Sequence, residues 1–165
     1  MFLPEIEGIA HEGVACSDPT NVFDIGSGGG FPAIPLAIIK QEWNFTLCES
    51  VKKKSGVLKH LIKELSLENK VQIIDDRVEA IHKLPLYKNK YDLVTARAIS
   101  KLDELIKYSL PLLKKGGYLL AYKGKNVEEE IKTTEKKYNL PIEIFTKEIN
   151  SIERKLVVVK SRDNS

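Results

Sequence analysis

The sequence predicts a Rossmann-like α/β protein: a doubly wound, mostly parallel sheet of seven strands with helices on both faces. Two observations predict this fold class. Short apolar runs alternate with helical stretches along most of the 165 residues, which is typical of parallel sheets. A glycine-rich turn at residues 26–30 separates the first apolar run from a helix-like segment. Strand, glycine turn and helix form the first unit of nucleotide-binding α/β folds.

Residues 1–20 are the least regular part of the chain. They mix Pro4, Gly8, Gly13 and Pro19 with acidic side chains and show little hydrophobic periodicity. We therefore expect a loop or a frayed lead-in there, followed by one folded domain over residues 21–165.

The first two predicted strands, 22–25 and 44–49, are each followed by a helix. Pro32 suits the first turn of the first helix, which runs to about Gln41, because its missing N–H costs nothing there. The second helix is expected from about Lys52 to Leu67. Its apolar positions predict one buried face, made of Val57, Leu58, Leu61, Ile62 and Leu65.

The middle of the chain continues this alternation. Strands are predicted at 71–74 and 91–96, with a short helix or turn at 77–82 between them. A helix is expected from Leu102 to Leu113, and the basic and glycine residues 114–117 are expected to form its last turn and its end. Its inward positions are Leu102, Leu105, Ile106, Ser109, Leu110 and Leu113.

The last third is predicted as strand 117–122, a polar helix over 126–139, and strands 142–148 and 156–160. No helix-like segment separates the last two strands. We therefore expect an antiparallel hairpin at the end of the sheet.

The composition is that of an ordinary globular protein, with 42% hydrophobic and 30% charged residues and a net charge of +3. This charge is too small to indicate nucleic-acid binding by itself. No apolar run approaches the roughly 20 residues that span a bilayer, and residues 1–20 lack the pattern of a signal peptide. Cys16 and Cys48 form no CxxC pair and the three histidines show no metal spacing, so we expect a protein of the reducing cytoplasm without a metal.

The glycine turn has two competing interpretations. Gly28-x-Gly30-x-x-Ala33 is compatible with a dinucleotide fingerprint, whereas Asp24-x-Gly26-x-Gly28-x-Gly30 resembles motif I of class I S-adenosylmethionine-dependent methyltransferases. Glu49, 23 residues after Gly26, ends the second predicted strand and is placed to accept ribose hydroxyls in either class. The acid before the turn and the glycine spacing favour the methyl donor.

A longer set of motifs is more specific. It consists of Gly26-Ser-Gly-Gly-Gly-Phe-Pro-Ala-Ile-Pro-Leu-Ala, Glu49-Ser50, Arg77-Val-Glu79, Arg97-Ala98, Lys123-Gly124 and Glu153-Arg154-x-Leu-Val-Val. In this order the motifs resemble the RsmG (GidB) family, whose members methylate a guanine N7 in 16S ribosomal RNA. The resemblance runs from about Val22 to Lys160. Ala33 stands where the family usually has glycine, and Asp76 where a small residue is common.

The resemblance implies a class I methyltransferase fold with S-adenosylmethionine as cofactor, Glu49 on the ribose, and Val78 and Glu79 on the adenine side. The implied cofactor contacts are Asp24, Gly26, Gly28, Gly30, Phe31, Glu49, Val78, Glu79 and Arg97. The implied partner is 16S ribosomal RNA or the small ribosomal subunit, with no membrane involved and the chain acting as a monomer.

No general base is expected. Guanine N7 already carries an in-plane lone pair, so catalysis reduces to alignment with the methyl group. No residue is therefore assigned as catalytic with certainty, and Arg97, Lys123 and Arg154 are candidates for positioning. Lys52, Lys53 and Lys54 oppose the dipole of the helix that they begin, so they are candidates for RNA phosphates together with Lys123 and Arg154. For all of these cations an ordinary surface or salt-bridge role remains open.

Three alternatives remain. The fold is compatible with a methyltransferase for another acceptor, or with a non-catalytic nucleotide-binding remnant; a dinucleotide dehydrogenase is less well supported, since no substrate domain is visible. The family also carries a helical N-terminal segment with Arg-His and Asp-Ser pairs, which residues 1–20 do not match. We therefore expect a shortened N-terminal region, a folded core able to bind cofactor, and RNA methylation that is weak or absent for this chain alone.

Overall fold

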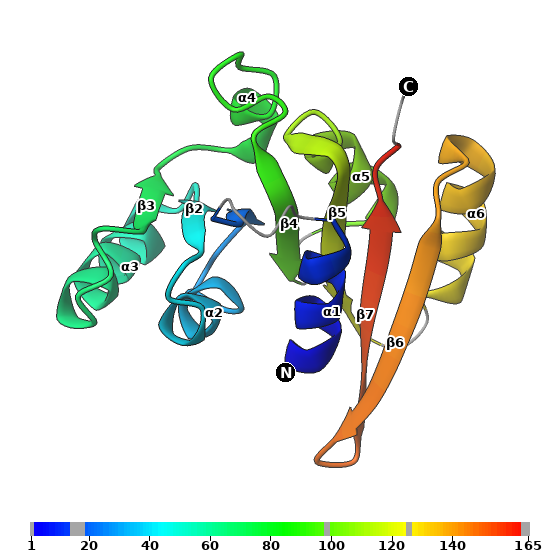
Figure 1. Cartoon of the computed structure of the whole chain (residues 1–165), viewed down its shortest axis with the longest axis horizontal. Coiled ribbons are helices and arrows are strands. Elements are labelled where there is room, and N and C mark those ends of the chain that lie inside the picture. The colour runs from blue at the N-terminus through cyan, green and yellow to red at the C-terminus, as the bar shows by residue number, and fades with distance from the viewer. Residues whose placement is uncertain (1, 14–18, 98–99, 125–126, 163–165) are drawn as a thin grey trace.

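The computed structural model describes residues 2–13, 19–97, 100–124 and 127–162. Its centre is a seven-stranded sheet in the order β3-β2-β1-β4-β5-β7-β6 (Figure 1). The strands are β1 Asn21–Ile25, β2 Asn44–Cys48, β3 Val71–Ile74, β4 Tyr91–Arg97, β5 Leu113–Lys123, β6 Ile142–Ile149 and β7 Ile152–Lys160. β1 to β5 run parallel, while β7 is antiparallel to both β5 and β6. The predicted fold class and the terminal hairpin are confirmed.

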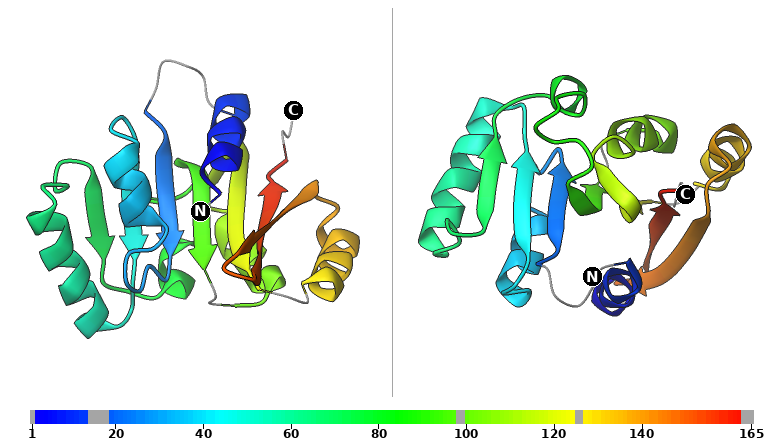
Figure 2. Two further views of the ribbon diagram at one scale, coloured as in Figure 1. Left: turned by 90° about the horizontal axis from the view of Figure 1, so that it is seen from below. Right: turned by 45° about the horizontal axis from the view of Figure 1, so that its top comes forward.

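Helices cover both faces of the sheet (Figure 2). They are α1 Leu3–Gly13, α2 Ala33–Ile39, α3 Lys52–Glu64, α4 Val78–Ile81, α5 Leu102–Ser109 and α6 Glu128–Tyr138. The first three contribute side chains to one hydrophobic core and the last three to the other. Consecutive residues of β1 alternate between these cores, with Val22 in one and Phe23 in the other, both at most 1% exposed. This burial on both faces explains why Val22 and Phe23 are apolar at consecutive positions instead of alternating with polar residues.

The expectation of a loop before residue 20 was wrong for its first part, because Leu3–Gly13 is the helix α1. Phe2, directly before the helix, and Ile6, Ile9 and Ala10 within it are buried at helical spacing. Pro4, Gly8 and Gly13 obscure this period in the sequence. The helix packs on β5 and β4. Glu5 pairs with Lys147 on β6 at 2.8 Å, and Glu7 pairs with Lys40 at 2.5 Å. Cys16 lies outside the described residues.

The expected glycine-terminated end of the helix after residue 102 was also wrong. Helix α5 ends at Ser109, and β5 already begins at Leu113, which pairs with Tyr91. The register between β4 and β5 shifts between Tyr91 and Leu93. A Cβ on Gly117 would lie 2.9 Å from the carbonyl oxygen of Asp92, so this glycine permits a close approach of two strands rather than the end of a helix.

Helix α3 buries a narrower face than its apolar pattern predicts. Leu58 and Ile62 are buried together with Ser55, whereas Val57 and Leu65 are 59% and 40% exposed. A helix at the edge of the sheet covers only the outer strands β2 and β3, so it has less surface against which to pack.

Candidate functional site

A cavity of about 750 Å³ lies where β1, β2, β4, β5 and β7 meet the carboxyl edge of the parallel sheet. One side of it is the glycine turn with Phe31 and Glu49. The other side is formed by Arg97 and Lys123, the last residues of β4 and β5, and by Arg154 near the start of β7. The structure therefore brings together most of the residues that the sequence singled out, at the edge where ligands of such sheets bind.

The glycines of the turn perform two different tasks. Gly28 has φ +55°, and an added Cβ there would meet only the oxygen of Gly26, at 3.8 Å; a Cβ on Gly29 would meet nothing within 4 Å. Their backbone is therefore bare toward the cavity. Gly30, with φ +86°, is different, because a Cβ there would lie 2.5 Å from Cγ1 of Ile34. Gly30 permits the packing of helix α2 and does not line the cavity.

Glu49 is held in place by the backbone. Its carboxylate accepts one hydrogen bond from the Gly28 N–H and another from the Val51 N–H, both 2.8 Å long. The residue is only 5% exposed, yet it lines the cavity. Each carboxylate oxygen has capacity for a further donor, so the group can accept hydroxyls from a ligand without giving up its own position.

Asp24 lies beneath the glycine turn rather than in the cavity. The residue is 1% exposed, Oδ1 accepts a 2.5 Å hydrogen bond from the Thr95 hydroxyl, and Oδ2 has no partner among the described residues. Burial raises the pKa of this carboxyl to about 7, against the lowering effect of the Thr95 hydrogen bond. Its predicted role as a direct cofactor contact has no support from the cavity lining.

A smaller hollow of about 130 Å³ adjoins the main cavity, and Gly26 and Ser50 line both. The predicted adenine-side residues Val78 and Glu79 line this hollow. Tyr108 and Cys48 line it as well, although no sequence motif assigns them to the site. Tyr108 comes from α5, and no local pattern connects it to residues 78–79. Burial raises the pKa of the Cys48 thiol to about 12, so this group is neutral at pH 7.

The cations of the site differ in how firmly they are held. The guanidinium of Arg97 lies over the Phe31 ring, 5.1 Å from its centroid, at a strand end where the residue is exposed. Lys123 donates to the carbonyl of Ser100 at 2.6 Å and to Glu130 of α6 at 3.0 Å. Arg154 is exposed at the cavity. Of the three lysines that begin α3, Lys54 lines the cavity and Lys52 and Lys53 do not.

Three further residues of the cavity lining, Phe2, Tyr122 and Lys155, were not predicted from the sequence. Phe2 packs edge-on against Tyr122, with 6.1 Å between ring centroids, and both line the cavity. The Tyr122 hydroxyl is buried without a partner among the described residues, and burial raises its pKa. Lys155 also lines the cavity and is paired with Glu128 and Glu153. Phe2 was missed because the helix that it directly precedes was not predicted.

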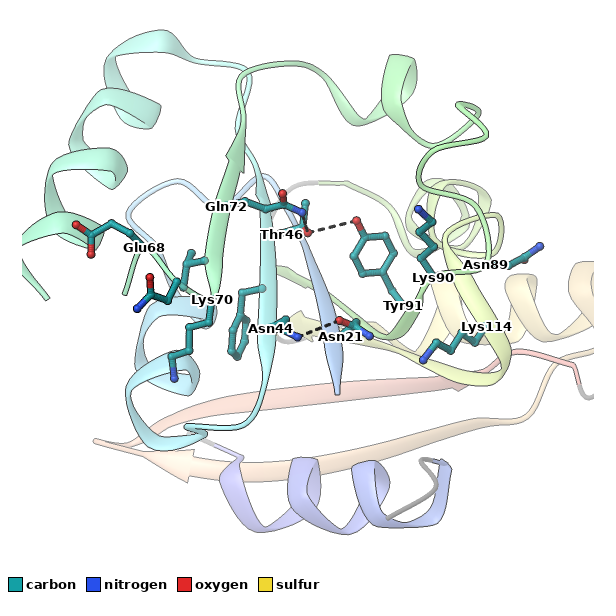
Figure 3. Close-up of a pocket in the computed structure, with 13 residues that line it drawn as sticks. Asn21, Asn44, Thr46, Glu68, Lys70, Gln72, Asn89, Lys90, Tyr91 and Lys114 are labelled. Carbon is teal, nitrogen blue, oxygen red and sulfur yellow. Dashed lines mark hydrogen bonds between the residues drawn. The ribbon is translucent and has the colours of Figure 1, made fainter. Parts of the chain in front are cut away.

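A second cavity of about 590 Å³ lies across the amino-terminal ends of the strands (Figure 3). It is lined by polar side chains that bond one another: Gln72 donates to the Thr46 hydroxyl at 2.7 Å, and Asn44 donates to Asn21 at 3.4 Å. None of the residues predicted for function lines it. The carboxyl-edge cavity is therefore the candidate functional site.

The sheet, the glycine turn and the acid at the end of β2 define the class I methyltransferase fold. An O-methyltransferase from Thermotoga maritima described as S-adenosylmethionine-dependent is similar in structure, with a TM-score of 0.72, 14% identity, and coverage of 98% of this chain and 66% of that one. The [4+2]-cyclase SpnF gives a TM-score of 0.74 at 12% identity, covering 97% of this chain and 82% of that one. Likeness at such identity establishes the fold alone.

The chain belongs to the rRNA small subunit methyltransferase G (GidB) family, whose model matches residues 10–157. The ribosomal RNA small subunit methyltransferase G of Lactobacillus helveticus is 43% identical over 114 residues, which are 69% of this chain and 47% of that protein. The protein of the same name from Clostridium novyi is 35% identical over 150 residues, 87% of this chain and 61% of that one. The chain thus spans about half the length of the curated relatives it matches.

No helix within residues 2–13, 19–97, 100–124 and 127–162 is both long and apolar enough to cross a membrane.

Proposed function

We propose that this chain binds S-adenosylmethionine in the carboxyl-edge cavity and transfers its methyl group to N7 of a guanine in 16S ribosomal RNA. The observation that carries the proposal is the Glu49 carboxylate, held by the Gly28 and Val51 N–H groups beside two bare glycines. This arrangement occurs in a chain of the methyltransferase G family.

The residues present fit the cofactor. Gly28 and Gly29 line the cavity, and no side chain covers their backbone, so the turn leaves room for a ligand to approach it closely. Glu49 would accept the two ribose hydroxyls, and Val78 and Glu79 would face the adenine. When bound, S-adenosylmethionine supplies a methyl group on a positively charged sulfur. Arg97, fixed over Phe31, borders the cavity at the end of β4.

Methylation of guanine N7 requires the protein mainly to align N7 with the methyl group. The N7 lone pair of guanine forms the new N–CH₃ bond as the S–CH₃ bond breaks. The bonding pair returns to sulfur and the positive charge passes to the purine, so no proton has to be removed. The protein's contribution is to hold N7 in line with the methyl group and to exclude water. This agrees with a site in which Arg97 and Arg154 are positioning candidates and no general base is required.

Contacts with RNA form a separate part of the proposal. Lys52, Lys53 and Lys54 are exposed at the start of α3, and Arg154 is exposed at the cavity. These four would bind phosphates. Lys123 is a weaker candidate, because Glu130 and Ser100 already bond its ammonium. Action as a monomer in the cytoplasm remains an expectation that accompanies the RNA substrate.

The test combines cofactor binding with methyl transfer. Calorimetric titration should detect binding of S-adenosylmethionine and none of NAD. Labelled methyl groups should then be transferred to small ribosomal subunits from cells lacking the modification, and the product should be mapped as N7-methylguanine. Cofactor binding with transfer to a different acceptor would identify another methyltransferase. Cofactor binding without any transfer would support a non-catalytic nucleotide-binding protein, and no cofactor binding would refute the proposal.

A further inference from the structure

The hairpin formed by β6 and β7 continues past the last residue of β5, because Lys123 pairs with Lys155 while the β6–β7 ladder runs on to Ile149 and Ile152. Its tip projects past the N-terminal end of α1 (Figure 1). Its turn consists of Asn150 and Ser151, with φ values of 50° and 59°, which is typical of a tight two-residue hairpin. Ile149 is directly opposite Ile152, and Lys147 is opposite Arg154. Opposite residues of a β-ladder share a face, so these four side chains lie on one face of the hairpin tip.

This face changes in character toward the tip. At its base Leu156 is fully buried and Phe145 packs against the same core. In the middle, Lys147 pairs with Glu5 and lies over the Phe2 ring, 5.2 Å from its centroid. At the end, Ile149 and Ile152 are 40% and 45% exposed. Two large apolar side chains thus reach into solvent beyond a cationic pair.

The same face borders the candidate site. Ile149 and Arg154 both line the large cavity. The opposite face of the tip carries the acids Glu148 and Glu153, which are paired in register with each other, and Glu153 binds Lys155 at 3.4 Å. Of the tip residues, Ile149 and Arg154 line the cavity, as does Lys155 of the opposite face, whereas Glu148 and Glu153 do not. The side chains that the hairpin contributes to the cavity are therefore basic and apolar, which complements a polyanion that carries stacking bases.

We propose that Ile149 and Ile152 form an apolar wedge that contacts unstacked RNA bases while the acceptor guanine occupies the cavity. The inference rests on the proposed RNA substrate. A base within a helix or stack must leave its neighbours to reach an enclosed site, and apolar side chains inserted beside it replace the lost stacking contacts. Arg154, one register position back, is placed to neutralise an adjacent phosphate.

The experiment compares Ile149→Ser/Ile152→Ser with the matched control Ile144→Ser. Ile144 is 44% exposed on the same strand but lies on the other face of the hairpin. All three substitutions replace exposed side chains, so thermal unfolding should stay at the wild-type value. Because Ile149 lines the cavity, S-adenosylmethionine affinity is measured for each variant, and rates are compared at saturating cofactor. We expect the double variant to lose roughly tenfold in kcat/KM for small-subunit RNA, as expected when a stacking contact is removed. The control should match wild type, and Ile149→Leu/Ile152→Leu should restore activity.

Direct readouts separate this inference from the proposed function. Fluorescence of 2-aminopurine next to the acceptor should rise on binding of wild type and much less with the double variant. Wild-type turnover together with an unimpaired double variant would overturn the wedge and leave the methyltransferase proposal intact. If wild type transfers no methyl group, equal RNA affinities of wild type and double variant would overturn the wedge as well. A double variant with changed oligomeric state and unchanged RNA affinity would identify the tip as a protein-binding surface instead.

Discussion

The two sides of the cavity are built in different ways. On the side of the glycine turn, backbone N–H groups hold one carboxylate, Glu49, through two bonds of 2.8 Å. On the side of β5 and β7, carboxylates from α6 hold two ammonium groups: Glu130 binds Lys123 at 3.0 Å, and Glu128 binds Lys155. The first side depends on main-chain geometry and the second on long side chains.

This difference between the two sides explains why the sequence predicts contacts on one side of the cavity better than on the other. A glycine turn with an acid on the next strand fixes its geometry within a short stretch of sequence, so its spacing predicts its contacts. A lysine at a family position has no such constraint. Lys123 is bound by a residue of the following helix, and its side chain is only 12% exposed, so position alone does not distinguish a ligand contact from a structural ion pair.

The largest effect is expected beneath the glycine turn, at Asp24. Its carboxyl has a pKa of about 7 in the folded state against an ordinary 3.8, so the folded protein binds the proton more tightly. The free energy of unfolding of wild type should therefore fall, relative to Asp24→Asn, as the pH rises from about 4 to about 7. The loss is about 1.4 kcal/mol per pH unit, about 4 kcal/mol in all. Urea unfolding of both proteins from pH 4 to 8 measures this loss. If the free energies of unfolding of wild type and Asp24→Asn changed with pH in parallel, the raised pKa of Asp24 would be contradicted.

The next effect concerns Glu49. Replacing it by alanine removes the acceptor of two backbone N–H groups and the proposed acceptor of the ribose. Affinity for S-adenosylmethionine should fall by about 1.5–3 kcal/mol, measured by calorimetry. Glu49→Gln keeps one carbonyl acceptor, so its affinity for S-adenosylmethionine should lie between those of wild type and the alanine variant. An alanine variant with wild-type affinity would remove Glu49 from the ribose assignment.

A smaller effect tests the other side of the cavity. Lys123→Met breaks the bonds to Ser100 and Glu130 and should lower the free energy of unfolding by about 1 kcal/mol, since Glu130 is partly exposed and screened. Arg154→Met is the matched comparison and should reduce RNA affinity with little change in stability. If Lys123→Met instead weakened RNA binding while the free energy of unfolding stayed constant, Lys123 would be an RNA contact like Arg154 and not a structural ion pair.

The smallest effect on stability is expected at the start of α3. Replacing Lys52, Lys53 and Lys54 by glutamine should leave cofactor affinity nearly unchanged and relieve cations that oppose the helix dipole. The salt dependence of RNA binding should become flatter, by up to about 0.9 per lost phosphate contact on a log–log plot. Lys132→Gln/Lys136→Gln on α6 serves as the control. If the slope of log RNA affinity against log salt concentration equalled that of wild type, the three lysines would be ordinary surface residues without phosphate contacts.

The sequence predicted most elements because their signals are local. Strands β1 to β4 and helices α2 to α6 lie where periodicity and turn residues indicate, and the motif residues Gly28, Glu49 and Arg97 meet at one edge since the carboxyl ends of parallel strands converge there. The failures have physical causes. Helix α1 is stabilised by burial of Ile6 and Ile9 on the sheet, and tertiary burial overrides weak local propensity. Strand β5 begins early because Leu113 pairs with Tyr91.

By itself, then, the sequence determined the order of the strands and of helices α2 to α6, the glycine turn and the acid that follows it, because these depend on neighbours along the chain. The tertiary structure decided which charged groups are bound by other side chains of the protein and which are available to a ligand. It placed Asp24 beneath the turn with a raised pKa, tied Lys123 to Glu130, and brought Phe2 and the hairpin tip to the cavity. Such outcomes depend on burial and on contacts between residues distant in sequence, which no local pattern encodes.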